Sequence, residues 1–213
     1  MRTVIKGPEP HRLGAYRHTA GATFDDYPDK PALRMSLVIE QRGLCCYCLQ
    51  RVRPEIGAMK IEHWHSRAPG RYPAEQLDYS NLLGACMGNE GQPRDHQHCN
   101  TRKGERDFSR NPAHLMPRIE ELIRFLGDGR IVSDHADFDA ELNDVLNLNE
   151  AKLRNRRKAV LDAFKGTLAK RGNLKRATLL KWLQDWNGDS QVDNLREFCQ
   201  VVVYWLQKRL ARG

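Results

Sequence analysis

The sequence LCCYC (residues 44–48) decides the fold that we expect for this chain. Cys45 and Cys48 have the spacing of a zinc knuckle, in which one tight turn supplies two thiolates to a tetrahedral ion. A structural site needs a second pair of ligands, and Cys86 and Cys99 follow further along the chain. The four cysteines therefore predict a structural zinc site.

Other residues beside these cysteines offer alternative ligands. His96 or His98 can replace Cys99, and Cys46 can compete for the first position of the knuckle. Cys199 lies on the apolar face of an expected helix, so we expect it to be an ordinary core residue.

The N-terminal residues MRTVIKGPEPHRL (1–13) lack the apolar segment of a secretory signal. No run in the sequence approaches the ~18 apolar residues of a membrane span. We therefore expect a cytoplasmic protein, where clustered cysteines bind metal more often than they form disulfides.

The length of the chain limits the number of domains, and its charge indicates the class of binding partner. The chain has 213 residues, enough for one good core, and a net charge of +8 with a pI near 9.3. A basic surface favours polyanions, because neutralising their charges releases counterions. We expect three segments: an N-terminal segment with a helix (1–44), a core with the zinc site (45–110) and a helical region (111–213), which can pack as one unit with the core.

The first half of the chain mixes helices with a strand. Asp29 can cap a helix that ends at Gly43, and residues 58–64 (AMKIEHW) alternate as a short strand does. We expect a short helix over residues 80–86, capped by Ser80 or Asn81, and another that begins near Cys99. The turn-rich residues 87–98 read as a loop.

The second half has helical spacing of apolar residues. Segments 115–126 and 138–171 predict helices, with a turn at residues 127–129 between them. The segment 192–210 predicts a last helix with one apolar face, formed by Leu195, Phe198, Val202, Leu206 and Leu210.

Between the two pairs of cysteines lie residues suited to phosphodiester hydrolysis. A neutral histidine such as His63 is a good base near pH 7, and oxygen atoms of Glu62 and Asn100 suit a hard divalent ion. Adjacent residues of an ideal strand point to opposite faces, so a strand end or a bulge is needed to turn Glu62 and His63 toward one site. His65 offers a second imidazole on the same face as His63.

The order of these motifs resembles the HNH, or ββα-metal, endonuclease family. Within that family the chain is most similar to the PtuB-type nucleases of Septu-type and retron-associated antiphage systems. The resemblance covers most of residues 1–160 and rests on LVIEQRGLCCYCLQRV (37–52), KIEHWHSR (60–67), LDYSNLLGAC (77–86) and HCNTRKGE (98–105), with KGPEP (6–10) and LNLNEAKLRNRR (146–157).

The resemblance implies a role for each motif residue. His63 would be the general base, Glu62 and Asn100 would bind a catalytic Mg²⁺ or Mn²⁺, and Asn81 would orient the base or its loop. Glu62 stands where Asp is commoner in the family, which lengthens this ligand by one methylene group. Asn81 has a second interpretation as a helix cap. The four zinc ligands implied are Cys45, Cys48, Cys86 and Cys99.

The resemblance also implies a fold and an activity. We expect an α+β protein with a small ββα-metal nuclease core, braced by the four-cysteine zinc site, and a mostly helical C-terminal region. The expected reaction leaves a 5′-phosphate and a 3′-hydroxyl, on DNA by default and on RNA as an alternative. The implied partners are a PtuA-like ABC/SMC-type ATPase and a retron reverse transcriptase with its DNA–RNA hybrid.

Basic residues suggest where nucleic acid binds. Arg102 and Lys103 are candidates for phosphate contacts. Residues 152–176 contain ten Lys or Arg and one acid, Asp162, which fits either a solvated helix face or a track for the substrate backbone. Three tryptophans near the C-terminus fit a docking surface or the chain's own core: Trp182, Trp186 and Trp205.

Two other functions compete with the nuclease. A zinc-ribbon module that binds nucleic acid without cutting it would explain the cysteines and the charge, but not Glu62, His63 and Asn100. A zinc deaminase needs H-x-E ahead of P-C-x-x-C, and this chain has neither a proline before Cys45 nor H-x-E upstream of it. The sequence therefore favours a nuclease.

Overall fold

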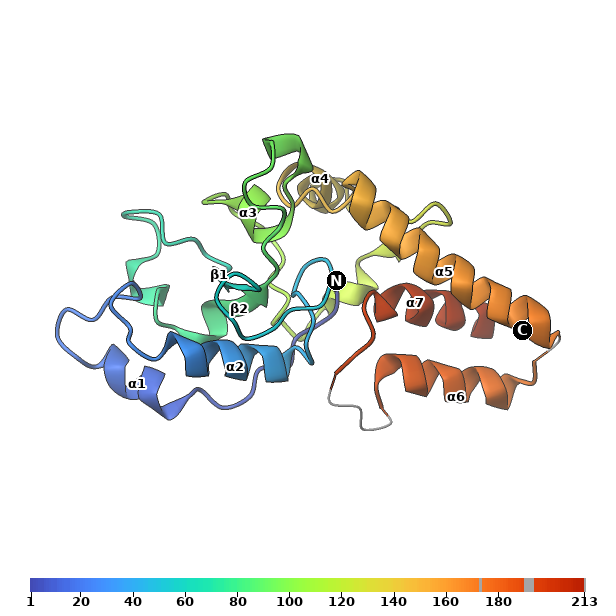
Figure 1. Cartoon of the computed structure of the whole chain (residues 1–213), viewed down its shortest axis with the longest axis horizontal. Helices are drawn as coiled ribbons and strands as arrows, with labels where there is room; N and C mark the ends of the chain where they lie inside the picture. The colour runs from blue at the N-terminus through green and yellow to red at the C-terminus, as the bar shows by residue number, and fades with distance from the viewer. Residues whose placement is uncertain (173, 190–193, 213) are drawn as a thin grey trace.

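The computed structural model describes residues 1–172, 174–189 and 194–212 (Figure 1). In these ranges the chain is an α+β protein with seven α-helices and two small antiparallel sheets. No helix in them is long and apolar enough to span a membrane. The helices are α1 (His11–Arg17), α2 (Lys30–Glu40), α3 (Cys99–Lys103), α4 (Ala136–Asp144), α5 (Ala151–Arg171), α6 (Arg176–Asn187) and α7 (Cys199–Leu210).

The strands β1 (Lys60–His63) and β2 (Leu82–Ala85) form an antiparallel pair, with His63 opposite Leu82. The helix α3 follows them in the chain, after a loop. The strand over residues 58–64 and the helix that begins at Cys99 are therefore confirmed, with shorter bounds.

The helix that we expected over residues 80–86 is wrong. A 3₁₀ turn (η2, Tyr79–Asn81) leads into the strand β2 instead. All four residues of β2 are buried, so the strand lacks the alternation that marks a half-exposed strand. The side chain of Gln41 accepts a hydrogen bond from the Gly84 N–H at 2.6 Å and donates one to the Gly84 carbonyl at 2.7 Å. These two bonds join the end of α2 to this strand.

The helix predicted to start after Asp29 is confirmed as α2. Pro31 lies in its first turn, and Leu33 and Leu37 are fully buried. Asp29 precedes the helix without a side-chain capping bond.

The helix expected over residues 115–126 is also wrong. This segment contains a 3₁₀ turn (η4, Ile119–Glu121) and then β3 (Arg124–Phe125), which pairs with β4 (Ile131–Val132). Asn149 bonds both backbone groups of Ile131 at 2.9 Å, and this anchors the hairpin to the residues before α5. The predicted turn at residues 127–129 connects two strands rather than two helices.

Two of the last three predicted segments are helical with other bounds, whereas α6 has no counterpart among the predicted helices. The segment 138–171 is divided between α4 and α5, and Glu150 caps α5 by accepting a bond from the Leu153 N–H at 3.1 Å. The helix α7 starts at Cys199, so Leu195 and Phe198 precede it. Residues 192–193 of the predicted helix lie outside the described residues.

One buried cluster joins all three expected segments. It contains Leu33 of α2, Leu82 of β2 and Phe138 of α4 among its members. Trp182, Trp186 and Trp205 are partly buried against the hydrophobic clusters of the chain itself.

Candidate functional site

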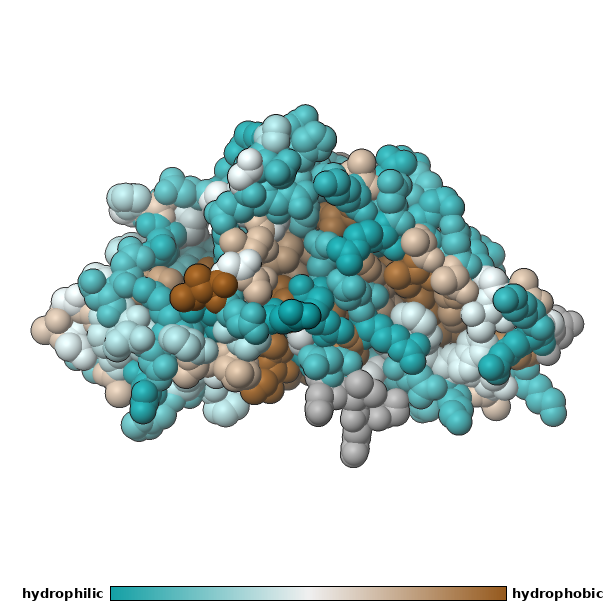
Figure 2. Space-filling view, viewed as in Figure 1, coloured by the Kyte–Doolittle hydropathy of each residue, from teal (hydrophilic) through white to brown (hydrophobic). Residues whose placement is uncertain are grey.

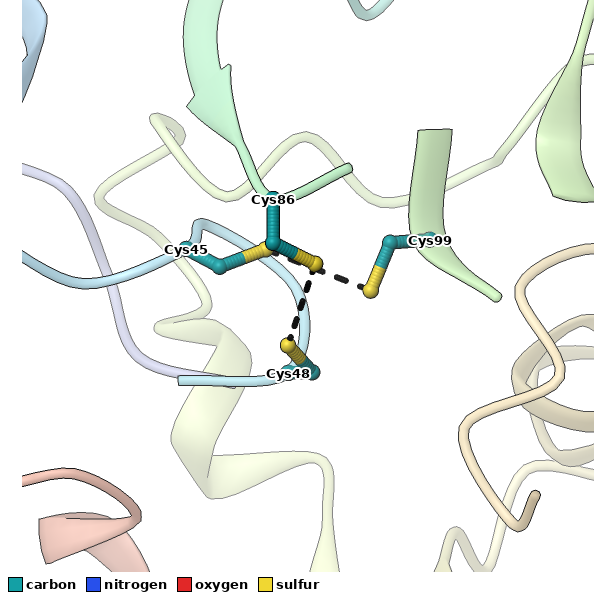
Figure 3. A group of neighbouring side chains, drawn as sticks. All are labelled: Cys45, Cys48, Cys86 and Cys99. Atoms are coloured by element: carbon teal, nitrogen blue, oxygen red, sulfur yellow. Dashed lines mark hydrogen bonds between the residues drawn. The ribbon is translucent and has the colours of Figure 1, made fainter. Parts of the chain in front are cut away.

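The sulfur atoms of Cys45, Cys48, Cys86 and Cys99 converge in the interior (Figure 3). All four lie within 4.8 Å of one another, with 3.9 Å between Cys45 and Cys99 and 3.6 Å between Cys48 and Cys86. Tetrahedral zinc with Zn–S bonds of about 2.3 Å places its sulfur ligands about 3.8 Å apart. These four buried cysteines can therefore hold a metal ion such as zinc.

Backbone bonds fix the cysteines in place. In the knuckle, the Cys45 N–H donates to the Gln50 carbonyl at 2.8 Å. The Cys46 N–H donates to the Gly84 carbonyl at 3.0 Å, which attaches the knuckle to β2. Cys86 directly follows β2. Cys99 begins α3, and its N–H donates to the Leu146 carbonyl at 2.8 Å.

The alternative ligands lie outside this group. Among the described residues, the cluster with metal-binding geometry consists of the four cysteines, without Cys46, His96 or His98. His98 is buried beside it, with Nδ1 3.2 Å from the Cys99 sulfur. Cys199 is fully buried in a separate hydrophobic cluster, as expected for a core residue.

The electrostatics of the cluster favour a cation. Burial raises the pKa of the Cys48 and Cys99 thiols, because a charged sulfur in the interior loses its hydration. Four thiolates can therefore stay together in this place only when a positive charge compensates them.

A cleft of about 680 Å³ lies near this cluster, and His63 and Asn100 are both part of its wall. Four basic side chains contribute to the same wall: Lys30, Arg34, Lys60 and Arg67. The acidic residues in it are Asp25 and Glu105, so positive charge predominates.

The imidazole of His63 is held in one orientation. Its Nε2 lies 2.9 Å from the backbone oxygen of Gln76, and the ring of Phe24 packs edge-on against it at 4.4 Å between centroids. A carbonyl oxygen only accepts hydrogen bonds, so Nε2 carries the proton and Nδ1 of the neutral ring is the acceptor.

The protonation state of His63 suits a base. Burial lowers its pKa from 6.5 to about 4, and the bond to Gln76 opposes this effect only in part. The ring is therefore neutral at pH 7 and can accept a proton.

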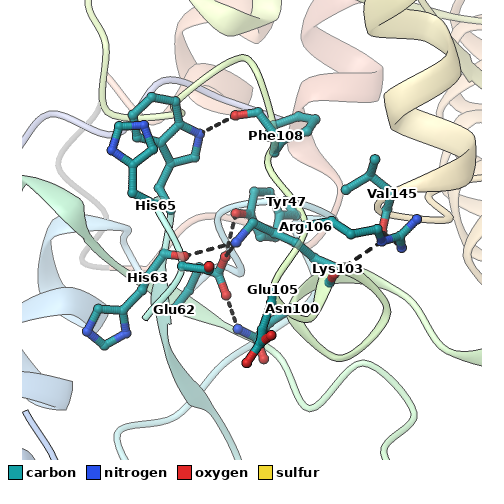
Figure 4. A network of polar contacts seen from close by, with 12 residues as sticks. Tyr47, Glu62, His63, His65, Asn100, Lys103, Glu105, Arg106, Phe108 and Val145 are labelled. Atoms are coloured by element: carbon teal, nitrogen blue, oxygen red, sulfur yellow. Dashed lines mark hydrogen bonds and ion pairs between the residues drawn. The ribbon is translucent and has the colours of Figure 1, made fainter. Parts of the chain in front are cut away.

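Glu62 points to the opposite side of β1 from His63 (Figure 4). Its carboxylate is fully buried, where it accepts a bond from the Tyr47 hydroxyl at 2.8 Å and pairs with Lys103 at 3.0 Å. Burial raises the pKa of Glu62, and the ammonium group of Lys103 opposes this. We expected a strand end or a bulge to turn Glu62 and His63 toward one site. His63 is the last residue of β1, but the two side chains still point to opposite sides of the strand.

Asn100 connects the two sides of the strand. Its amide nitrogen donates to Oε2 of Glu62, and the residue also lines the cleft together with His63. Glu62 itself is not part of the cleft wall, so Asn100 stands between this carboxylate and the cleft.

The structure corrects our expectation for Lys103. Its side chain is only 1% exposed, and Nζ donates to the backbone oxygen of His63 at 3.0 Å besides pairing with Glu62. A phosphate cannot reach an amine that is enclosed in this way. Arg102 lies nearer the surface, where its guanidinium group donates to the Arg94 carbonyl at 2.8 Å.

Asn81 holds the chain that follows His63. Its side-chain oxygen accepts from the His65 N–H at 2.8 Å, and its nitrogen donates to the carbonyls of His65 and Glu75, each at 3.1 Å. The capping residue of this turn is Asp78, so the interpretation of Asn81 as a cap is wrong.

His65 is occupied by other contacts. Nδ1 lies 2.6 Å from the Glu75 carboxylate, and the ring is stacked between Trp64 and Tyr72 at centroid distances of 4.0 and 4.1 Å. His65 does not line the cleft that contains His63. It braces the loop that Asn81 holds.

Sequence reasoning missed two contributors to the site. Tyr47 lies inside the knuckle motif and bonds Glu62, a role that the motif itself does not indicate. Gln76 acts through its backbone carbonyl, which any residue would supply, so no side-chain signal marks it. No protein-family model matches this chain, and no curated protein matches it.

Proposed function

We propose that this chain is a metal-dependent endonuclease of the HNH type, which hydrolyses phosphodiester bonds. The observation that carries the proposal is the neutral imidazole of His63, oriented by Gln76 in a basic cleft that it shares with Asn100. The order of β1, β2 and α3, with cysteines at both ends of the unit, supports the same proposal.

His63 would act as the general base. Its Nδ1 takes a proton from a water molecule, whose oxygen attacks the phosphorus while the bond to the 3′-oxygen breaks. The leaving 3′-oxygen takes a proton from solvent water, so the products are a 5′-phosphate and a 3′-hydroxyl. The basic side chains Lys30, Arg34 and Lys60 at the cleft would attract and position the phosphate backbone.

Asn100 and Glu62 are the oxygen-bearing side chains that the motif resemblance assigns to the catalytic Mg²⁺ or Mn²⁺. Asn100 fits this role because it is part of the cleft wall. Glu62 does not fit it in this arrangement, because its carboxylate is fully buried behind Asn100 and already bonded to Tyr47, Lys103 and Asn100, so it would have to leave these contacts to reach a metal in the cleft. When bound, the metal would stabilise the negative charge that develops on the phosphate and the leaving oxygen.

The four cysteines would bind structural zinc, away from the reaction. Four thiolate ligands complete a tetrahedral shell and leave no position for water, so zinc in this place would stabilise the fold without taking part in hydrolysis.

Cleavage assays with His63→Ala test the proposal. Plasmid DNA and total RNA are incubated with wild type and variant, with Mg²⁺ or Mn²⁺ added. His18→Ala is the matched control, because His18 is exposed and is not among the residues that line the cleft. We expect wild type and His18→Ala to cut and His63→Ala to be inactive. Binding without cutting by all three proteins would instead indicate a non-catalytic nucleic-acid-binding module.

The same assay separates the two substrates. DNA is the expected one, and cleavage of RNA alone would identify an RNase that uses the same site.

We further propose that the nuclease serves as the effector of a Septu-type or retron-associated antiphage system. The resemblance of the motifs in residues 37–105 supports this role. Co-purification with a PtuA-like ATPase, or with a retron reverse transcriptase and its DNA–RNA hybrid, tests it.

A further inference from the structure

A second hollow lies far from the cleft, between α5 and α6. It has a volume of about 420 Å³, and three aromatic side chains line it: Phe164, Trp182 and Trp186. Phe164 contacts both tryptophans edge-on, at 6.0 and 6.2 Å between centroids. Figure 2 shows that hydrophilic side chains cover most of the face drawn there, with a small hydrophobic group exposed just below α5. We call this hollow the aromatic pocket.

Two arginines stand at the aromatic pocket. The guanidinium group of Arg171 lies over Trp182 at 5.3 Å, and that of Arg196 lies over Trp186 at 4.6 Å. Both arginines are exposed. The pocket therefore combines ring surfaces with positive charge, which is the combination that binds a base and its phosphate in single-stranded nucleic acids.

A third hollow, of about 480 Å³, lies between the aromatic pocket and the cleft. Arg51, Arg53 and Arg156 are in its wall, beside Cys86 of the metal cluster. Met87 belongs to both this hollow and the cleft wall, so the two adjoin.

The helix α5 connects the third hollow to the aromatic pocket. Arg156 faces the third hollow, and Val160, Phe164, Thr167 and Arg171 line the pocket at steps of three or four residues, which is one face of a helix. From Arg156 to Arg171 the helix rises about 22 Å.

Exposed cations predominate along this helix. Its exposed basic residues are Lys152, Arg156, Lys158, Lys165, Lys170 and Arg171. Asp162 pairs with Lys158, and Glu197 pairs with Arg156 at 3.2 Å. Asp185 is the acid in the wall of the aromatic pocket. Positive charge therefore exceeds negative charge from the third hollow to the pocket.

We propose that the aromatic pocket binds an unpaired nucleobase of the substrate, whose backbone follows α5 and the third hollow to the cleft. This inference rests on the proposed nuclease function and specifies its substrate class: a nucleic acid with a single-stranded segment. A stacked strand rises about 3.4 Å per nucleotide along its axis, so roughly six nucleotides would cover the length of α5 between Arg156 and Arg171.

The arrangement favours nucleic acid over an acidic protein segment. An acidic peptide would need cations only around its anchor, whereas here they lie at both ends of this face of α5, with Lys152 and Arg156 at one end and Lys170 and Arg171 at the other, and in the third hollow beside the proposed catalytic cleft. A continuous polyanion matches that distribution.

Binding assays in a His63→Ala background test this proposal without cleavage. Fluorescence anisotropy measures the affinity for a labelled single-stranded 20-mer, as DNA and as RNA, and for a blunt duplex of the same length, with no divalent metal added. The variants are Trp182→Leu and Trp182→Phe. Phenylalanine keeps a ring on which a base can stack, and leucine does not. Retained zinc and an unchanged circular dichroism spectrum identify folded variants.

We expect Trp182→Leu to weaken single-strand binding about tenfold, to leave duplex binding unchanged, and to be largely rescued in Trp182→Phe. Equal losses for single strand and duplex, no loss in Trp182→Leu, or stronger competition by poly-glutamate than by an oligonucleotide would each overturn the proposal. The cleavage assay on wild type is read separately. A protein that binds as expected but never cuts would refute the nuclease and leave the base-binding pocket standing.

Discussion

Nζ of Lys103 lies 3.0 Å from Oε1 of Glu62, and neither side chain is more than 1% exposed. The pair joins α3 to β1, since Nζ also bonds the carbonyl of His63. Removing one partner of a buried ion pair leaves the other charge without compensation. Lys103→Met should therefore lower the free energy of unfolding in urea by about 3–5 kcal/mol.

The double variant Glu62→Gln with Lys103→Met is the control. Because it removes both charges, we expect it to recover part of the loss. A single variant as stable as wild type would show that the pair does not contribute as described.

The cluster formed by Cys45, Cys48, Cys86 and Cys99 predicts that the stability of the chain depends on zinc through these four cysteines alone. We expect about one zinc per chain by elemental analysis. Cys48→Ser should lose this zinc and lower the melting temperature, because metal binding contributes to the free energy of folding. Cys46→Ser is the matched control: Cys46 is also buried in the knuckle, but it lies outside the cluster. Equal zinc loss in both variants would contradict the assignment.

The burial of His63 predicts a pH dependence of stability. The pKa of His63 is about 4 in the folded chain, whereas an unperturbed histidine, as in the unfolded chain, has a pKa of 6.5. Between these values the unfolded chain binds a proton that the folded chain does not, so stability falls as the pH drops from about 6.5 to 4. The lowered pKa corresponds to at most about 3 kcal/mol.

Urea unfolding at a series of pH values, without added divalent metal, measures this effect. His63→Gln should flatten the dependence in that window, because glutamine does not titrate. If the slope persists unchanged in the variant, another group causes it.

The contacts of Asn81 predict that replacing it lowers the proposed catalytic activity while the fold is kept. Its side chain makes three hydrogen bonds that hold residues 65 and 75 together, next to the Gln76 carbonyl that orients His63. In Asn81→Ala we expect kcat to fall tenfold or more with KM little changed. A tenfold decrease needs an increase of only about 1.4 kcal/mol in the activation free energy, which a less well positioned His63 can cause. Asn111→Ala, at another buried asparagine, controls for a general loss of stability. A parallel decrease in both variants would argue against a positioning role.

The metal cluster could be predicted because its signal is local. Two cysteines three positions apart restrict the backbone to a tight turn whatever surrounds it, and Cys86 and Cys99 were the remaining cysteines in the right part of the chain. Asn81 and His63 were identified through motif order. Their partners were not, because the carbonyl of Gln76 belongs to a residue brought near by the fold.

The two wrong helices have a common physical cause. Leu82 and Leu83 are adjacent and both buried, since β2 is covered on both sides, so its apolar run fits a helix as well as a strand. In the segment 115–126, Ile119 and Ile123 are buried four residues apart, which is a spacing that a helix also produces. Tertiary contacts decide such segments: Gln41 bonds Gly84 across from α2, and Asn149 bonds Ile131 in the strand opposite.

The bond from the Cys99 N–H to the Leu146 carbonyl has a consequence for how the protein matures during synthesis. The last cysteine of the cluster is fixed by a residue in the second half of the chain, and that contact forms only after the ribosome has released Leu146. A nascent chain that already contains His63, Asn100 and all four cysteines would still hold them loosely. The proposed catalytic centre would then be assembled late, so an unfinished chain would not yet have the activity that we propose.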